Sequence, residues 1–233
     1  MENQENMVVE RRSAVIPQSW IFWAAIGAGI SYMIPVLLEV GGALYVTVWK
    51  GLGVGLLALW AARNASGRNG WLFAAVLAFG ALGDVVLETD LVTGGIAFAI
   101  GHMLAIYFYL TNGRESLSAS QKLLAVAVVV GAPLIAWALP YDRSLVWQPT
   151  LYTLFVAAMA AAAWISRFPR YRTGLGAMLF VVSDLFIFSR FGPLEASFLP
   201  TLFVWPLYFG GQALIAWGVV DTLTAETGQR ENY

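Results

Sequence analysis

Eight apolar segments, each about 20 residues long, constrain the fold of this chain more than any other feature. They cover residues 20–37, 43–62, 71–88, 93–110, 122–139, 148–165, 173–190 and 200–220. A helix of about 20 apolar residues is long enough to cross the hydrocarbon core of a bilayer. The sequence therefore predicts an all-α, polytopic membrane protein with about eight transmembrane helices.

The composition supports this class. Only 12% of the 233 residues are charged and 59% are hydrophobic, whereas a soluble domain carries about 25% charged residues. Too little polar surface is available to cover a globule in water. Residues 1–19 lack the small-residue cleavage pattern of a signal peptide. We expect a cytoplasmic N-terminal segment over 1–19, an eight-span domain over 20–220 and a cytoplasmic tail over 221–233.

Positive charges gather on one side of the predicted topology. The side of the N-terminus holds Arg11, Arg12, Arg63, Arg68, Arg114, Lys122, Arg167, Arg170, Arg172 and Arg230. The other side holds only Arg143 and Arg190, together with five acidic residues, Glu39, Glu88, Asp90, Asp142 and Glu195. An excess of Lys and Arg marks the cytoplasmic side. We therefore expect both termini in the cytoplasm, in a bacterial inner membrane.

Charge and residue counts exclude several kinds of site. The net charge of −1 argues against a nucleic-acid partner, which would need a basic face. The chain has no cysteine and one histidine, so thiolate, iron–sulfur and multi-histidine metal sites are excluded, although a carboxylate site for a hard cation stays open. We predict no metal and no cofactor. Membrane lipids are the expected surroundings, and the oligomeric state stays open.

Four ionisable residues, Lys50, Asp84, His102 and Asp184, lie inside the apolar segments. A buried charge in lipid costs about 2.5–3.5 kcal/mol on insertion scales, so such residues persist only when they are paired or face a wet cavity. At a rise of about 1.5 Å per residue, all four lie in the outer half of the membrane, as does Tyr208. We expect these five side chains to line one cavity that opens outward.

A short internal similarity links two of the segments. Residues 79–87 and 179–187 each place a small residue before an Asp and apolar residues after it. Both stretches lie at the same depth in helices that run the same way. The fold can therefore consist of two parallel four-helix repeats.

The same motifs carry a family resemblance. Ala81–Leu87 with Gly101–Leu104, and Gly176–Asp184 with Pro206–Ile215, resemble in order and spacing the YhhN family of membrane proteins. Members of that family characterised as enzymes are lysoplasmalogenases. These cleave the vinyl ether bond of alkenyl-glycerophospho-ethanolamine or -choline and release a fatty aldehyde and a glycerophospho-base. The resemblance implies an ether-bond hydrolase acting on a lysophospholipid. Lys50 departs from the family pattern, because Gly51 follows it where a proline is common.

The chemistry of vinyl ethers can be compared with the residues directly. Hydrolysis begins with slow protonation of a carbon, which gives an oxocarbenium ion that water attacks. An enzyme needs one carboxylic acid that keeps its proton near neutral pH and a second carboxylate that stabilises the cation and activates water. Asp84 and Asp184 fit this pair as catalytic residues, and the sequence leaves open which of them is the acid.

The remaining polar residues have two interpretations each. Lys50 either holds the lipid phosphate or compensates the charge of an aspartate. His102 either influences the protonation of the two aspartates or joins helices by a hydrogen bond. Tyr208 and Gln212, one turn apart, either line the pocket and contact the substrate or pack between helices. Two other functions stay open: a proton-coupled transporter of small molecules or lipids, which also places ionisable residues in the membrane, and a non-catalytic lipid-binding protein.

Overall fold

The computed structural model describes residues 19–40 and 44–230. Its helices are α2 (Trp20–Ser31), α3 (Met33–Leu37), α4 (Leu44–Arg63), α5 (Gly67–Val86), α6 (Leu91–Thr111), α7 (Ala119–Ala138), α8 (Trp147–Ile165), α9 (Leu175–Ser189) and α10 (Leu199–Arg230). No β-strand occurs in the part of the chain that the structure describes. Eight helical segments are long and apolar enough to cross a membrane, with α2 and α3 together forming the first. The predicted all-α, eight-span membrane fold is confirmed.

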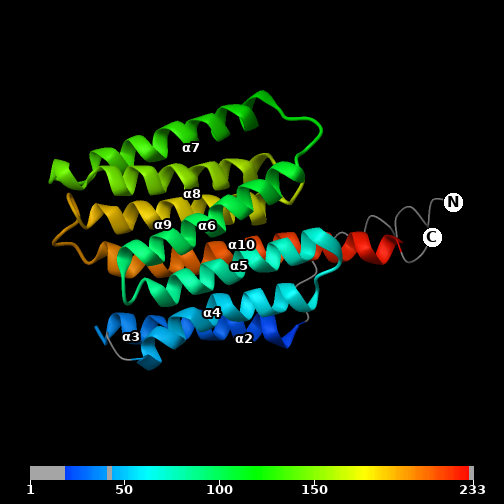
Figure 1. Cartoon of the computed structure of the whole chain (residues 1–233), viewed down its shortest axis with the longest axis horizontal. Coiled ribbons are helices and arrows are strands. Elements are labelled where there is room, and N and C mark those ends of the chain that lie inside the picture. Colours follow the sequence, from blue (N-terminus) through cyan, green and yellow to red (C-terminus); the bar gives the residue numbers. More distant parts are fainter. Residues whose placement is uncertain (1–18, 41–43, 231–233) are drawn as a thin grey trace.

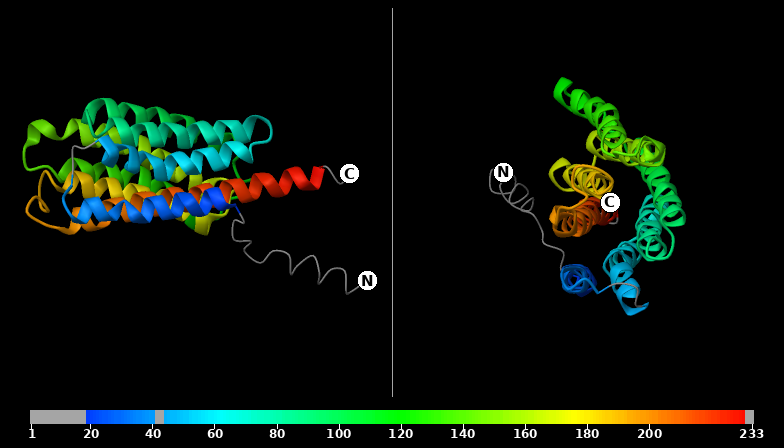
Figure 2. Two further views of the ribbon diagram at one scale, coloured as in Figure 1. Left: turned by 90° about the horizontal axis from the view of Figure 1, so that it is seen from below. Right: turned by 90° about the vertical axis from the view of Figure 1, so that its left-hand side faces the viewer.

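The helices lie side by side and alternate in direction (Figure 1). Seen from one end, α4, α5, α6, α8 and α7 follow one another in a curved row, and α9 and α10 lie on its concave side (Figure 2). Helix α10 contacts α9, α5, α4 and α2. The last helix in sequence is therefore the central one in space, and residues along it meet side chains from both halves of the chain.

The two ends of the bundle differ in the sign of the charged residues that they carry. The end where α5 stops and α6 starts carries Glu39, Glu88, Asp90, Asp142 and Glu195, and we call it the acidic end. The opposite end, the basic end, carries Arg63, Arg68, Arg114, Lys122, Arg167, Arg170 and Arg172. Helix α2 begins and α10 ends at the basic end (Figure 1).

Glycines allow α10 to approach its neighbours closely. A Cβ atom on Gly176 of α9 would lie 2.5 Å from the carbonyl oxygen of Gly211 in α10, and a Cβ on Gly211 would lie equally close to the carbonyl oxygen of Gly176. Gly29 of α2 likewise leaves room for the ring of Phe209. Small residues at such contacts bring helix backbones together where no hydrophobic effect drives association.

Helix α10 is longer than its apolar segment. It continues to Arg230, whereas the sequence places the end of the last span near residue 220. The extension carries two acidic residues that pair with the basic end: Asp221 accepts a hydrogen bond from Arg172 at 2.9 Å, and Glu226 pairs with Arg167. These ion pairs hold the polar extension beside the bundle, so the helix does not end where the apolar residues end.

Candidate active site

Asp84 is buried in α5 near the acidic end and is held by Tyr208 of α10. The Tyr208 hydroxyl donates a hydrogen bond of 2.7 Å to Asp84 Oδ2. Gln212, one turn further along α10, is hydrogen-bonded to the Tyr208 side chain. Gly80, one turn before Asp84, leaves room for Gln212, because a Cβ there would lie 3.2 Å from Gln212 Nε2 and would crowd it. Three residues that the sequence singled out are thus joined in one network.

Asp184 of α9 belongs to a second network, which the sequence did not predict in full. The Tyr152 hydroxyl of α8 lies 3.3 Å from His102 Nε2 and also interacts with the Asp184 carboxyl. Asp184 is 4% exposed, and its Oδ2 atom has no hydrogen-bond partner among the described residues. Tyr152 therefore connects His102 to Asp184. Nothing in the pattern around residue 152 distinguishes this tyrosine from the many aromatic residues that only pack.

The two networks share an aromatic wall. The ring of Phe180 lies 4.9 Å from that of Tyr208 and 5.1 Å from that of His102, measured between centroids. Phe98 packs edge-on to Tyr208 at 5.9 Å and stacks against His102 at 6.4 Å. Asp84 is 2% exposed and Asp184 is 4% exposed, so both carboxyls are buried beside this wall. The structure thus brings both aspartates, His102, Tyr208 and Gln212 into one buried polar cluster with aromatic walls.

The residue before each aspartate has a structural role. A Cβ on Gly83 would lie 2.7 Å from the ring of Phe98, so only glycine fits there without moving the aromatic wall. Ser183 donates a hydrogen bond of 2.9 Å to the Val204 carbonyl oxygen of α10. The Ser183 hydroxyl therefore joins α9 to α10.

Lys50 lies beside the cluster, on its side toward the acidic end. Its Nζ atom pairs with Glu88 Oε1 at 2.5 Å, and the two side chains are 14% and 26% exposed. The Lys50 charge acts on Asp84, but no hydrogen bond joins them. Sequence reasoning missed Glu88 as the partner, because it placed that residue only among the charges of the outer loops.

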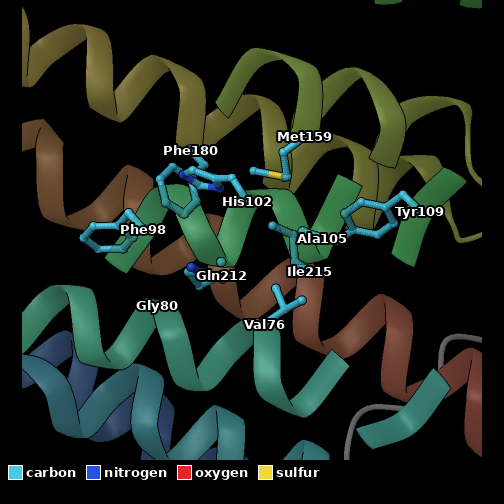
Figure 3. A pocket seen from close by; sticks show the side chains of 11 residues that line it. Val76, Gly80, Phe98, His102, Ala105, Tyr109, Met159, Phe180, Gln212 and Ile215 are labelled. Carbon is cyan, nitrogen blue, oxygen red and sulfur yellow. The ribbon is translucent and has the colours of Figure 1, made fainter. Parts of the chain in front are cut away.

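A cavity adjoins the cluster on the side away from the acidic end (Figure 3). It is lined by Val76, Gly80, Phe98, Gly101, His102, Ala105, Tyr109, Met159, Phe180, Gln212 and Ile215. Of the five side chains expected to share one cavity, only His102 lines it. Asp84 Oδ2 accepts the hydrogen bond from Tyr208, Asp184 interacts with Tyr152, and Lys50 pairs with Glu88.

Helix α6 is fixed at the acidic end by a helix cap. Asp90 accepts a hydrogen bond of 2.6 Å from the backbone N–H of Thr93. Hydrogen bonds from the side chain and backbone of Thr93 hold the pKa of Asp90 below its ordinary value of 3.8. The cap is therefore anionic at neutral pH and complements the positive end of the helix dipole. This capped helix carries Phe98 and His102 into the cluster.

The described residues do not bring three His, Cys, Asp or Glu side chains together in a group that would hold a metal ion. The polar groups that the site offers are the two carboxyls, their tyrosine partners, the histidine and the nearby ion pair.

The chain is similar in sequence to two proteins named lysoplasmalogenase. Lysoplasmalogenases of Mycobacterium bovis and Mycobacterium tuberculosis are each 29% identical to it over 216 residues, which covers 84% of this chain and 80% of each relative. No solved structure matches the chain. The family model of the YhhN family matches residues 45–219, a range that includes every residue of the polar cluster. This match covers most of the chain, which therefore belongs to the YhhN family.

Proposed function

We propose that this protein is a membrane hydrolase that cleaves the vinyl ether bond of lysoplasmalogens by aspartate general acid–base catalysis. The observation that carries the proposal is the pair of buried carboxyls, Asp84 and Asp184, in one cluster with aromatic walls inside the helix bundle. The name lysoplasmalogenase carried by two relatives supports the same substrate class.

The reaction needs one proton donor and one anion. A carboxylic acid first transfers its proton to the vinyl carbon that is not bonded to oxygen, which leaves an oxocarbenium ion and a carboxylate. Water then adds to the carbon bonded to oxygen and gives up a proton, so that a hemiacetal forms and one carboxyl is protonated again. The hemiacetal breaks its carbon–oxygen bond to the glycerol, which gives a fatty aldehyde and a glycerophospho-base. One water molecule is consumed, and both carboxyls return to their starting states.

The surroundings of the two aspartates suggest how these roles divide. Asp84 accepts a hydrogen bond from Tyr208 and lies in the field of the Lys50 ammonium group, and both interactions stabilise a carboxylate anion. Asp184 has an oxygen atom buried without a hydrogen-bond partner in the described structure. An unpaired buried oxygen is far more costly on an anion than on a neutral acid. We therefore assign proton donation to Asp184 and stabilisation of the cation to Asp84.

The other polar residues support these two. His102 contacts Tyr152, which in turn contacts Asp184, so we assign His102 the task of positioning the proton donor through this tyrosine. Gln212 holds the Tyr208 hydroxyl in place beside Asp84. The Lys50–Glu88 pair lies beside Asp84 on the side of the acidic end and is partly exposed, so Lys50 is the residue that we expect to meet the lipid phosphate.

Replacing each aspartate by asparagine tests the proposal. Asp84→Asn and Asp184→Asn keep the size of the side chain but can neither donate the proton nor carry the charge. General acid–base steps contribute about 100- to 10,000-fold each to the rate. In both variants the rate of aldehyde release from lysoplasmalogen in detergent should therefore fall at least about 100-fold.

The matched control is Asp221→Asn, which changes an aspartate in an ion pair at the basic end and should keep native turnover. An ester-linked lysolipid should release no aldehyde with any variant. If both Asp84→Asn and Asp184→Asn keep activity within tenfold of the native protein, the proposed mechanism is refuted.

A further inference from the structure

The cavity beside the polar cluster has the size of one water molecule. The centre of a water-sized sphere can occupy about 20 Å³ of it, and about 10–15 Å³ is enough for one water. A buried water also needs roughly two to four polar partners. The polar groups in the lining therefore decide whether a water binds there.

Two polar side chains line the cavity at the same level of the bundle. Helices α6 and α10 both run from the acidic end to the basic end, and the rings of Phe98 and Tyr208 join them at 5.9 Å between centroids. His102 and Gln212 each follow one of these residues by four positions, so both lie one turn further along. Both are buried and line the cavity (Figure 3). An imidazole and an amide thus flank the cavity just beyond the point where two rings fill the space between α6 and α10.

The side-chain amide of Gln212 presents an acceptor that needs a donor. The Tyr208 hydroxyl gives its single proton to Asp84, so its oxygen can only accept a hydrogen bond from Gln212. Gln212 Nε2 and the Tyr208 hydroxyl accordingly lie together beside Gly80, at 3.2 and 3.8 Å from a Cβ placed there. With the nitrogen used for Tyr208, the oxygen Oε1 is left to accept a hydrogen bond from another group.

His102 likewise has a second ring nitrogen to satisfy. Its Nε2 atom lies 3.3 Å from the Tyr152 hydroxyl, and none of the described residues forms a hydrogen bond with Nδ1. Nδ1 accepts or donates a hydrogen bond, depending on which ring nitrogen carries the proton. A water molecule matches either state, because it can both donate and accept, and it still has a proton to give to an amide oxygen.

We propose that the cavity binds one water molecule, which donates a hydrogen bond to Gln212 Oε1 and forms a second one with His102 Nδ1. The water joins the network of Asp84 to the network of Asp184 in one chain of hydrogen bonds. A change at Gln212 then reaches His102 through the water. The water site does not depend on the reaction proposed above.

The experiment uses the single histidine of the chain as its probe. Purified full-length protein with ¹⁵N-labelled histidine gives one pair of ring-nitrogen resonances, and solid-state NMR detects which protons lie next to each nitrogen. The native protein should show a cross-peak between water protons and Nδ1. Gln212→Leu removes the second partner of the water and changes no hydrogen bond that the described structure gives to His102.

Ala105→Val fills the cavity instead. Ala105 lines the cavity one turn beyond His102 and is 2% exposed, so the added methyl groups take the place of the water. We expect both Gln212→Leu and Ala105→Val to lose the water cross-peak and to shift the Nδ1 resonance. The contact of Nε2 with Tyr152 should remain in both, which shows that the imidazole ring has kept its place.

Ala127→Val on α7 is the matched control, since Ala127 is exposed on the outside of the bundle and should leave the water cross-peak native. Absence of a water contact at Nδ1 in the native protein would overturn the water site. A cross-peak that persists in Gln212→Leu would overturn the bridge. If the cross-peak is present and is lost as expected but no vinyl ether is cleaved, the water site stands and the proposed reaction fails.

Discussion

Tyr208→Phe is the sharpest test of the division of roles between the two aspartates. The substitution removes one oxygen atom, whose hydrogen bond to Asp84 Oδ2 is 2.7 Å long, and keeps the ring that packs against Phe180. A hydrogen bond to a charged group contributes about 1.5–3 kcal/mol, compared with about 0.5–1.5 kcal/mol between neutral groups. At about 1.36 kcal/mol per tenfold change, an anionic Asp84 that loses this donor binds a proton about 10- to 150-fold more tightly.

The expected result is a change in the pH dependence of turnover. Since the donor stabilises the anion, its loss means that a higher pH is needed to ionise Asp84. The acidic limb of the pH–rate profile should therefore move to higher pH by about 1–2 units, and turnover near neutral pH should fall accordingly. A purely structural role for Tyr208 would lower the amount of folded protein without moving this limb.

Two controls complete the experiment. Tyr107→Phe removes a tyrosine hydroxyl from the same bundle, one that accepts a hydrogen bond of 2.6 Å from Arg68 on the surface, and should keep the native profile. In an Asp84→Asn background, Tyr208→Phe should add little further loss, because the two residues act through one contact. A native acidic limb in Tyr208→Phe, with turnover within about twofold, would refute the assignment of the anion to Asp84.

Two further predictions concern the headgroup and the topology. Lys50→Met should raise the KM for lysoplasmalogen about tenfold with kcat retained, because a charge-assisted contact to phosphate is lost; an unchanged KM in both Lys50→Met and the Lys50→Met/Glu88→Gln double variant would exclude a phosphate contact. The chain lacks cysteine, so Asp142→Cys and Arg68→Cys each provide a single thiol, and we expect a membrane-impermeant maleimide to label intact cells only through Asp142→Cys. Labelling of both from outside, or of Arg68→Cys alone, would contradict cytoplasmic termini.

The sequence alone predicted the membrane fold and much of the polar cluster. Segment length fixed the number of spans, because hydrocarbon thickness sets how many apolar residues a helix needs. Helix rise then placed Asp84, His102, Asp184 and Tyr208 at similar depths, since depth depends only on position along the chain. The Gly-Asp and Ser-Asp motifs also pointed to the family that the comparisons confirm.

Tertiary structure decided which side chains meet. In a lipid-facing bundle the apolar stripe of a helix does not show which face turns inward, because lipid and protein core are both apolar. Depth therefore could not reveal that Tyr152 connects His102 to Asp184, or that Lys50 turns toward Glu88. Helix rotation and packing fix those contacts.

The end of α10 illustrates the same division. Hydropathy detects where apolar residues stop, near residue 220, but not whether a polar helix continues. The continuation to Arg230 lies beside the basic end, where Arg172 and Arg167 pair with Asp221 and Glu226. The two pairs join residues that are 49 and 59 positions apart in sequence, and only the packing of α10 against the segment between α8 and α9 brings them together. The sequence thus determined what crosses the membrane and how deep each polar group lies, while the fold determined which groups form a site.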